Sequence, residues 1–348
     1  MNIIHTYLND SSFIKKDSSI FSEIGELNNF EFKIKSKFHL PFSFFHQLLF
    51  ILTSGWEANV FIVQFSGYHA LLPVLFARMT GKKSIIISGG TDCVSFPGIG
   101  YGYFNKPILK TFTKWSYQLC HHILPKHESL WFCDYHYDAT EPSTQGIKAF
   151  SPHLKTPYTV ITNGYDPEQW PLLNLKRKKN SFITLSGAFE YPFQVQLKGI
   201  DLILTIAPYF PECTFTIAGV PNSIKLEILS ENVIVLPPIP HHELAALFNT
   251  YEYYMQLSMA EGFPNALCEA MLCGCTPIVS NVFSMPEIVA DSSLVLSTKD
   301  KSKLQLLIQS LLENGPHLPE QSRYKITSRF AFEIRKKNIK TIVETINI

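Results

Sequence analysis

The feature that most constrains the fold is a series of short runs that are apolar along their whole length. Residues 60–64 and 84–88 are two clear examples, and a helical pattern over residues 68–79 separates them. Strands that are apolar on both faces must be covered on both faces, and parallel strands need a crossover such as a helix between them. The first part of the chain therefore predicts a parallel sheet covered by helices.

A second series begins after a turn at residues 163–167 and a basic connector at residues 175–180, which we interpret as exposed. Further apolar strands are expected at residues 182–185, 215–218, 233–236, 253–257 and 278–280. The prediction is an α/β protein with two doubly wound parallel sheets, whose strand ends form a cleft if the sheets face each other. The predicted parts are residues 1–165, a linker at 166–180, residues 181–328 and a last segment at 329–348.

Composition excludes several functions. Thirty basic and twenty-nine acidic residues leave no overall field to attract nucleic acid. The seven cysteines show no CxxC spacing, and the pairs His121-His122 and His241-His242 lack companion ligands, so no metal site is predicted. The first residues do not resemble a signal peptide, and no apolar run reaches spanning length. We expect a cytoplasmic protein.

One helix is predicted to be buried on every side. It begins near Pro264 and ends before Gly274, and most of its side chains are apolar. Glu269 is the exception, because a buried carboxylate is costly unless it is hydrogen-bonded or lines a wet cleft. A second carboxylate, Glu261, lies eight positions earlier. This pair is the strongest candidate for a functional site.

Lys198 is a second candidate, because it precedes a predicted helix over residues 200–207. A cation is disfavoured at a helix N-terminus, and a phosphate shared with the free N–H groups would remove the conflict. The alternative is a lysine that extends into water.

Gly89-Gly90-Thr91-Asp92 follows a predicted strand and is a weaker candidate. Two glycines permit the close approach of a ligand, but such turns are common. The chain has no GxGxxG or GxxxxGK[ST] motif, which disfavours nicotinamide and NTPase functions. It also lacks an Asp-x-Asp pair that would hold a metal on a diphosphate. A bound phosphate is therefore expected to be neutralised by protein groups.

The segment from Phe38 to Leu52 is rich in phenylalanine and follows three lysines. One interpretation is an interfacial helix that rests on a membrane carrying a lipid-linked acceptor. The other is a core helix that packs on the sheet.

Several motifs together resemble glycosyltransferase family 4, a retaining family with the two-domain GT-B fold. The C-terminal motifs that carry the resemblance are Glu261 and Glu269 with Ala270-Met271, Gly274, residues 277–280 and residues 286–289. Asn163-Gly164-Tyr165-Asp166, Lys198-Gly199, Ser258 and residues 217–219 are also similar to family motifs. The resemblance implies that the last helix, over residues 330–346, crosses back to the first domain.

The resemblance implies roles for individual residues. Glu269 would accept hydrogen bonds from the ribose of a nucleotide-sugar, Glu261 would contact the sugar, and Lys198 would stabilise the departing diphosphate. The remaining donor-binding positions that it implies are Gly262, Phe263, Asn265, Ala266, Gly187 and Gly219. On the acceptor side it weakly implies Gly89, Gly90, Thr91 and His69, with Asp92 as a further catalytic candidate.

One departure from the family pattern concerns the phosphate clamp. The family commonly has an arginine directly after a glycine in this region, whereas Gly187 is followed by Ala188. Another basic group would then substitute, the donor would bind in a different position, or activity would be low.

The resemblance predicts a metal-independent retaining glycosyltransferase without a cofactor. Its donor would be a nucleoside-diphosphate sugar and its acceptor a glycan or a lipid-linked molecule. The expected role is cell-surface polysaccharide synthesis at the inner face of the membrane. Two alternatives remain open, a nucleotide-sugar 2-epimerase of the same fold and a non-catalytic sugar-nucleotide-binding subunit.

Overall fold

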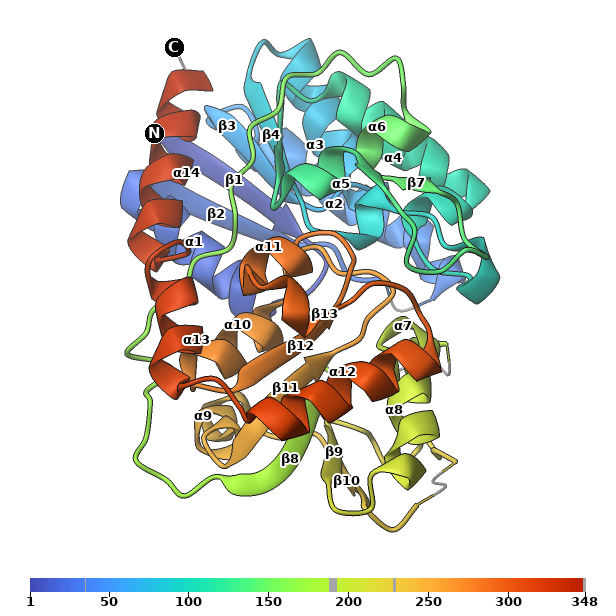
Figure 1. Ribbon diagram of the computed structural model, residues 1–348. Helices are drawn as coiled ribbons and strands as arrows, with labels where there is room; N and C mark the ends of the chain where they lie inside the picture. The colour runs from blue at the N-terminus through green and yellow to red at the C-terminus, as the bar shows by residue number, and fades with distance from the viewer. Residues whose placement is uncertain (35, 188–192, 228–229, 347–348) are drawn as a thin grey trace. The chain divides into compact units, whose positions relative to one another are not determined.

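The computed structural model describes residues 1–34, 36–187, 193–227 and 230–346 (Figure 1). The chain forms two compact units. Unit 1 contains residues 1–134, 144–162 and 333–348, and unit 2 contains residues 135–143 and 163–332. The predicted division placed residues 135–143 in the first domain, but their contacts are with unit 2. The carbonyl of Tyr137 accepts a hydrogen bond from the N–H of Lys299 at 2.7 Å, and the Tyr135 hydroxyl donates one to the carbonyl of Met259 at 3.1 Å.

Unit 1 is built on a five-stranded parallel sheet with the strand order β2-β1-β3-β4-β5. Its strands are β1 (Asn2–Tyr7), β2 (Glu26–Glu31), β3 (Val60–Gln64), β4 (Lys83–Ser88) and β5 (His122–Pro125). A small antiparallel pair is formed by β6 (Cys133–Asp134) and β7 (Thr144–Gln145).

Helices cover both faces of this sheet. The helices of unit 1 are α1 (Ser12–Ile24), α2 (Leu40–Ser54), α3 (Tyr68–Met79), α4 (Pro107–Leu119), α5 (Glu128–Trp131), α6 (Ile147–Phe150) and α14 (Phe332–Ile346). The connection from β1 to β2, through α1, runs in one direction across the sheet. The connections from β2 to β3, β3 to β4 and β4 to β5, through α2, α3 and α4, run in the opposite direction. Because such crossovers are right-handed, α1 lies on one face and α2, α3 and α4 lie on the opposite face.

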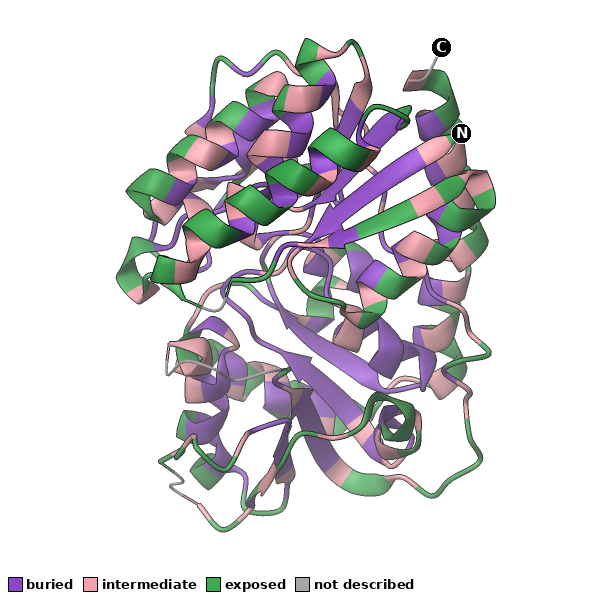
Figure 2. Ribbon diagram, turned by 180° about the vertical axis from the view of Figure 1, so that it is seen from behind, coloured by how far each residue is buried: buried purple, intermediate pink, exposed green. Residues whose placement is uncertain are grey.

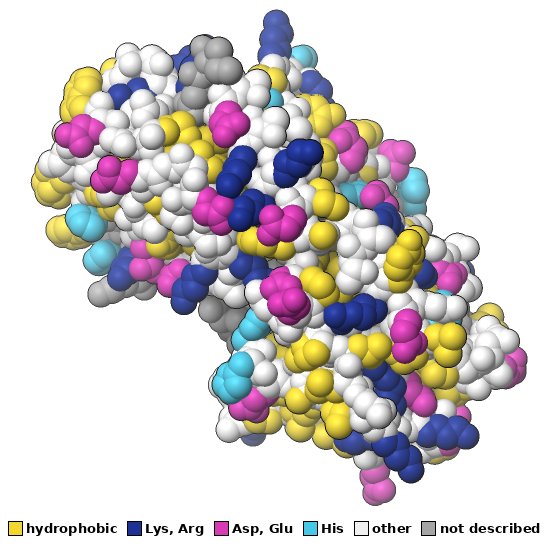
Figure 3. Space-filling view, turned by 90° about the vertical axis from the view of Figure 1, so that its left-hand side faces the viewer, with side chains coloured by type: hydrophobic (Ala, Val, Ile, Leu, Met, Phe, Trp, Pro, Cys, Tyr) yellow, Lys and Arg dark blue, Asp and Glu magenta, His cyan; other side chains and the backbone are white. Residues whose placement is uncertain are grey.

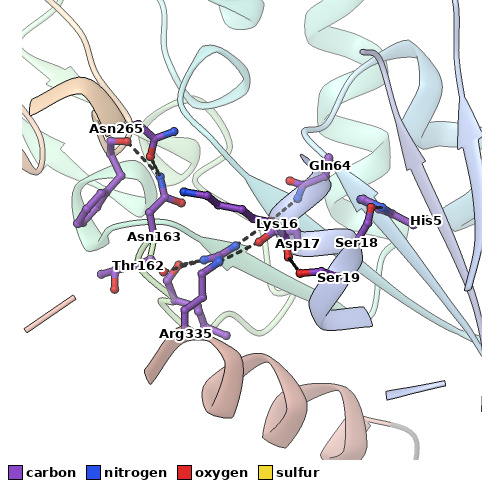
Figure 4. Close-up of polar contacts among 12 residues, drawn as sticks. His5, Lys16, Asp17, Ser18, Ser19, Gln64, Thr162, Asn163, Asn265 and Arg335 are labelled. Atoms are coloured by element: carbon purple, nitrogen blue, oxygen red, sulfur yellow. Dashed lines mark hydrogen bonds and ion pairs between the residues drawn. The ribbon is translucent and has the colours of Figure 1, made fainter. Parts of the chain in front are cut away.

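Helix α14 packs on unit 1 beside α1, as the family resemblance implied. Arg335 of α14 forms a buried ion pair with Asp17 of α1 at 2.8 Å, and Gln64 donates a hydrogen bond to the same carboxylate at 2.5 Å (Figure 4). The same guanidinium also donates to the carbonyls of Ile161 and Thr162 at 3.1 and 2.7 Å. This network joins α14 to α1 and to residues 161 and 162, after which the chain continues into the main segment of unit 2.

Unit 2 is built on a six-stranded parallel sheet with the strand order β10-β9-β8-β11-β12-β13. Its strands are β8 (Lys178–Leu185), β9 (Thr214–Ala218), β10 (Val233–Leu236), β11 (Tyr251–Gln256), β12 (Thr276–Ser280) and β13 (Val295–Leu296). Its helices are α7 (Gln194–Leu197), α8 (Ile200–Ile206), α9 (Leu244–Phe248), α10 (Asn265–Leu272), α11 (Met285–Val289), α12 (Lys301–Asn314) and α13 (Pro319–Thr327). The two predicted parallel sheets are confirmed.

The connector before β8 is exposed at residues 175, 176, 178 and 179, as predicted, and Arg177 is the part that is tied to the fold. Arg177 is half-buried and donates hydrogen bonds to the carbonyls of Tyr251 and Cys273, at 2.5 and 2.6 Å. Cys273 follows the last residue of α10, so the guanidinium meets the negative end of that helix. Strand β8 also begins at Lys178, inside the range predicted as linker.

Candidate functional site

The candidate site lies in unit 2, where the direction of strand order reverses. The chain passes from β8 outward to β9 and β10, and then returns to β11 on the other side of β8. Open parallel sheets bind ligands at such a switch point, at the carboxyl ends of the strands. The loop after β11 carries Glu261, and Gly187 follows the end of β8.

Glu261 is the centre of a polar cluster after β11. One carboxylate oxygen, Oε1, lies 2.6 Å from Nζ of Lys198 and accepts hydrogen bonds from Ser258 at 2.8 Å and Gln256 at 3.0 Å. Tyr254 in turn donates to Oε1 of Gln256 at 2.8 Å, which orients the Gln256 amide. The structure thus brings together two residues predicted for the site, Lys198 and Glu261.

Gly199 explains why Lys198 approaches β11 so closely. Its φ of +68° is a left-handed conformation, and a Cβ atom at this position would overlap the carbonyl oxygen of Leu257. The neighbouring contact is a hydrogen bond from the N–H of Met259 to the carbonyl of Leu197 at 2.8 Å. Only glycine permits this approach without a shift of the backbone.

The start of α10 is fixed by two residues of the turn at 163–166. The side chain of Asn163 donates to the carbonyl of Phe263 at 3.2 Å and to the side-chain oxygen of Asn265 at 2.9 Å. The hydroxyl of Tyr165 donates to the same oxygen at 2.8 Å. The first N–H groups of a helix have no partner within it and carry its positive end. The start of α10 is therefore a rigid set of donors that suits an anion or a sugar oxygen.

Glu269 is buried in α10 as predicted, with an exposed fraction of 5%. The carboxylate is near the ring of His241, whose Nε2 lies 3.6 Å from Oε1 of Glu269. No side chain or N–H in the described part of the chain donates a hydrogen bond to Glu269. Since a buried carboxylate is costly without such donors, the site is suited to a ligand that supplies hydroxyl groups.

His241 is a site residue that sequence reasoning missed. Its ring packs edge-on against Trp170, with the centroids 5.2 Å apart. In the sequence the histidine pair suggests only a metal ligand, and 27 intervening residues separate His241 from Glu269. Their proximity depends on the packing of α9 and α10, which no local motif reveals.

Asp92 and His69 are both buried in unit 1 and are hydrogen-bonded to the fold itself. The buried carboxylate of Asp92 accepts hydrogen bonds from three backbone N–H groups, at 2.9 to 3.1 Å, and from Tyr117 at 2.8 Å. His69 is buried and bonded to the carbonyl of Gln64 at 2.8 Å. With its acceptor sites already used by the fold, Asp92 stabilises the loop that contains it.

The other acceptor-side candidates belong to the same loop. The N–H groups of Gly89 and Gly90 both donate to Asp92, and the hydroxyl of Thr91 lies 2.8 Å from that of Tyr101. A Cβ atom at Gly89 would overlap the ring of Phe65, so this glycine is needed for packing.

The two donor-side glycines, Gly219 and Gly187, are in different environments. The N–H of Gly219 donates to the carbonyl of Leu236 at 3.0 Å and so is not available to a ligand. Gly187 is exposed. Ala188, where the family has an arginine, lies outside the described residues.

A buried lysine of unit 1 had no sequence signal. Lys126 directly follows β5 and is 4% exposed, and its Nζ lies 4.3 Å from the centroid of the Phe13 ring. Burial lowers the pKa of Lys126 to about 8. Near neutral pH its amine can therefore exchange a proton more readily than an exposed lysine.

Comparison with known proteins gives a match for the second part of the chain. Residues 174–329 match the model of the family Glycosyl transferases group 1. The match includes Lys198, Glu261 and Glu269.

The similar curated proteins are glycosyltransferases. A protein of Arabidopsis thaliana that forms part of phosphatidylinositol N-acetylglucosaminyltransferase is 24% identical over 151 residues, which cover 40% of this chain and 34% of that protein. O-antigen chain mannosyltransferase B of Escherichia coli is 34% identical over 78 residues, 22% of this chain and 20% of that protein. The matched segments thus span about a third of the first relative and a fifth of the second.

Similar solved structures extend over nearly the whole chain. Sucrose-phosphate synthase of Thermosynechococcus elongatus has a TM-score of 0.72 at 12% identity, with 99% of each chain covered. HepE of Anabaena, solved with UDP-glucose, has a TM-score of 0.67 at 12% identity, with 99% of this chain and 100% of that chain covered. These neighbours show that the chain has the GT-B fold.

Proposed function

We propose that this chain is a retaining glycosyltransferase that moves a sugar from a nucleoside-diphosphate sugar to a glycan or a lipid-linked acceptor without a metal ion. The observation that carries the proposal is Glu269. Its carboxylate is buried and receives no hydrogen bond from the described residues, so it suits the two hydroxyl groups of a ribose. Solved neighbours that bind UDP or UDP-glucose support a donor of this class.

Charge compensation in the proposed reaction comes from Lys198 and α10. Transfer breaks the bond between the anomeric carbon and a phosphate oxygen, so negative charge develops on the departing diphosphate. The Lys198 ammonium and the N–H groups at the start of α10 are the groups that would stabilise this charge, and such stabilisation is usually a large catalytic term. From this arrangement we predict that the reaction requires no metal ion.

Glu261 is proposed to act on both Lys198 and the sugar. Its Oε1 is bonded to Lys198, Ser258 and Gln256, while Oε2 makes no hydrogen bond within the described residues. Oε2 is therefore available to a sugar hydroxyl. Retention of the anomeric configuration would follow if the acceptor attacks from the face that the diphosphate leaves, as in the family that the motifs resemble.

Donor binding tests the proposal directly. Titration calorimetry with UDP-, GDP- and ADP-sugars should identify one class that binds the wild type. Glu269→Gln should weaken that binding by about tenfold or more, because a neutral amide replaces two strong acceptor atoms with one weaker one. Glu243→Gln removes a carboxylate from the loop beside His241 and serves as the control, with binding unchanged. Equal affinity of the wild type and Glu269→Gln would overturn the assignment.

Turnover separates the proposal from its two alternatives. A 2-epimerase would convert UDP-N-acetylglucosamine when the donor is supplied alone, whereas a transferase needs an acceptor. A non-catalytic subunit would bind the donor without turnover until a partner protein is added. We propose that the transfer is a step of polysaccharide synthesis. Release of the nucleoside diphosphate only when a glycan or lipid-linked acceptor is present would support this role.

A further inference from the structure

Helix α2 of unit 1 presents an apolar stripe to solvent. Large apolar side chains recur every three or four residues, which places them on one side of a helix. These residues, the α2 stripe, are Phe42, Phe45, Leu49 and Leu52 of α2, with Phe38 just before the helix and Trp56 just after it. Their exposed fractions range from 45% for Leu49 to 91% for Phe38. Single exposed apolar residues are normal, whereas a contiguous exposed apolar surface of this kind is typical of an interaction site.

The rotation of α2 is fixed by polar contacts on its inward side. Gln47 is buried and donates a hydrogen bond to the carbonyl of His69 at 2.7 Å, and Ser43 donates to the carbonyl of Lys33 at 2.6 Å. A rotation that buried the stripe would leave both of these carbonyls unsatisfied. The helix thus turns polar side chains towards the protein and apolar ones outward. Figure 2 shows exposed residues along the outward side of the helices of unit 1.

The charge of this region is strongly biased. Residues 32–127 contain ten lysines and arginines but only two acidic residues, a formal excess of eight, although the whole chain has a net charge of +1. Helices α2, α3 and α4 contain no aspartate or glutamate. On the face that Figure 3 shows, by contrast, basic and acidic side chains are interspersed. The bias therefore belongs to one region of the molecule.

Helix α4 carries two further lysines of this region, Lys110 and Lys114. Its Phe112 ring lies 5.9 Å from that of Phe44 in α2, so the two helices are in contact. Lys110 and Lys114 of α4 form no ion pair within the described residues. Trp115 is 51% exposed beside Lys114. Apolar and aromatic side chains flanked by unpaired lysines are typical of a surface that binds at a membrane interface.

We propose that the α2 stripe and the α4 lysines dock this chain onto the surface of an anionic phospholipid bilayer. Anionic headgroups complement the basic charge, and the phenylalanine and leucine side chains enter the boundary between headgroups and acyl chains. A second copy of the chain fits less well, because it would bring like charges together on helices that have no acidic residue. No helix in the described part of the chain is long and apolar enough to cross a bilayer. The contact is therefore with the surface of the bilayer. This inference goes beyond the transferase proposal and does not depend on it.

Vesicle co-sedimentation tests the docking surface. The wild type should bind vesicles of phosphatidylcholine with phosphatidylglycerol, bind vesicles of phosphatidylcholine alone more weakly, and dissociate as salt is raised. Phe42→Ser with Phe45→Ser should weaken binding by more than about tenfold, because two exposed rings no longer enter the bilayer. Lys110→Gln with Lys114→Gln should weaken binding to the anionic vesicles by about fivefold for each lysine.

Matched controls use residues of similar exposure in unit 2. Leu306 and Tyr324 are 66% and 70% exposed, and Leu306→Ser with Tyr324→Ser should leave vesicle binding unchanged. Lys176→Gln with Lys179→Gln removes two exposed lysines elsewhere and should also have little effect. Thermal unfolding of every variant checks that it is folded, and vesicle binding is measured without any nucleotide-sugar.

Three outcomes would overturn the inference. The first is a wild type that binds neither kind of vesicle, and the second is an equal loss of binding in the control variants. The third is a wild type that is dimeric by light scattering and becomes monomeric with Phe42→Ser and Phe45→Ser. That result would identify the stripe as an interface between copies. Loss of donor binding by Glu269→Gln leaves vesicle binding intact, so failure of one proposal is distinguishable from failure of the other.

Discussion

Gly199 lies against the carbonyl of Leu257, in a left-handed conformation that leaves no room for a side chain. We expect Gly199→Ala to displace Lys198 from Glu261 and to weaken donor binding strongly. Gly81→Ala is the matched control, since Gly81 also has a positive φ of +72° but has no atom within 4 Å of the place that a Cβ atom would occupy. The control should cost about 1 kcal/mol of stability, from backbone strain alone. Calorimetry and chemical unfolding of both variants measure the difference, and equal effects would contradict the steric explanation.

Lys198 is expected to act mainly on turnover. Lys198→Met removes the cation that faces the departing diphosphate while it keeps a side chain of similar length. The turnover number should fall by at least about a hundredfold, the scale of losing one group that stabilises charge in a transition state. Lys299→Met is a comparison within unit 2, because Lys299 is paired with Asp201 rather than with Glu261. A smaller effect for Lys198→Met than for Lys299→Met would argue against the proposed role.

The buried ion pair between Arg335 and Asp17 should contribute to the stability of unit 1. Arg335→Met leaves the Asp17 carboxylate buried without its charged partner, so the free energy of unfolding should fall by about 3 to 5 kcal/mol. The comparison is Lys340→Met, on the same helix as Arg335. It breaks an exposed pair with Glu23 of α1 and should change the free energy of unfolding little. Denaturant titration followed by circular dichroism gives both values. Similar losses for the two variants would show that burial of the pair is unimportant.

Two buried histidines predict loss of stability in mild acid. Burial lowers the pKa of His5 and of His69 to about 4, from an ordinary value of 6.5. Below pH 6.5 the unfolded chain binds protons that the folded chain does not, so stability falls as the pH decreases towards 4. Between about pH 7.5 and about pH 5 the loss should be about 2 kcal/mol for each histidine.

Histidine replacement checks this assignment. His69→Gln lowers stability at neutral pH but should reduce the difference between the two pH values by about half. The exposed His242 provides the control, because His242→Gln should leave the pH dependence unchanged. An unaltered pH dependence in His69→Gln would mean that other groups cause the acid effect.

Sequence patterns predicted the strands and helices in which burial alone determines which residues are apolar. Strands such as β3 and β4 are apolar along their length because both faces are covered, and this pattern is local. Strand β2 has no such local pattern, since Asn28 and Asn29 have low strand propensity and the strand exists through pairing with β1.

The candidate site shows the same division between local and distant information. Burial of Glu269 follows from the apolar residues around it, and the structure agrees. The role of Asp92 could not be predicted, because its four hydrogen-bond donors come from separate segments, including Ser66 and Tyr117. The contact between Glu269 and His241 also depends on tertiary packing.

The path of the chain has a consequence for the order of folding. The main segment of unit 2, residues 163–332, begins and ends at adjacent points, where Tyr165 pairs with Ala331 in a parallel bridge. Helix α14, which completes unit 1, comes after every residue of unit 2. During synthesis the first 134 residues must therefore wait for the last helix, while unit 2 is already complete when the ribosome reaches α14. The unit that is synthesised first is the last to be finished, and a nascent chain held just before α14 should contain a folded second unit and an incomplete first one.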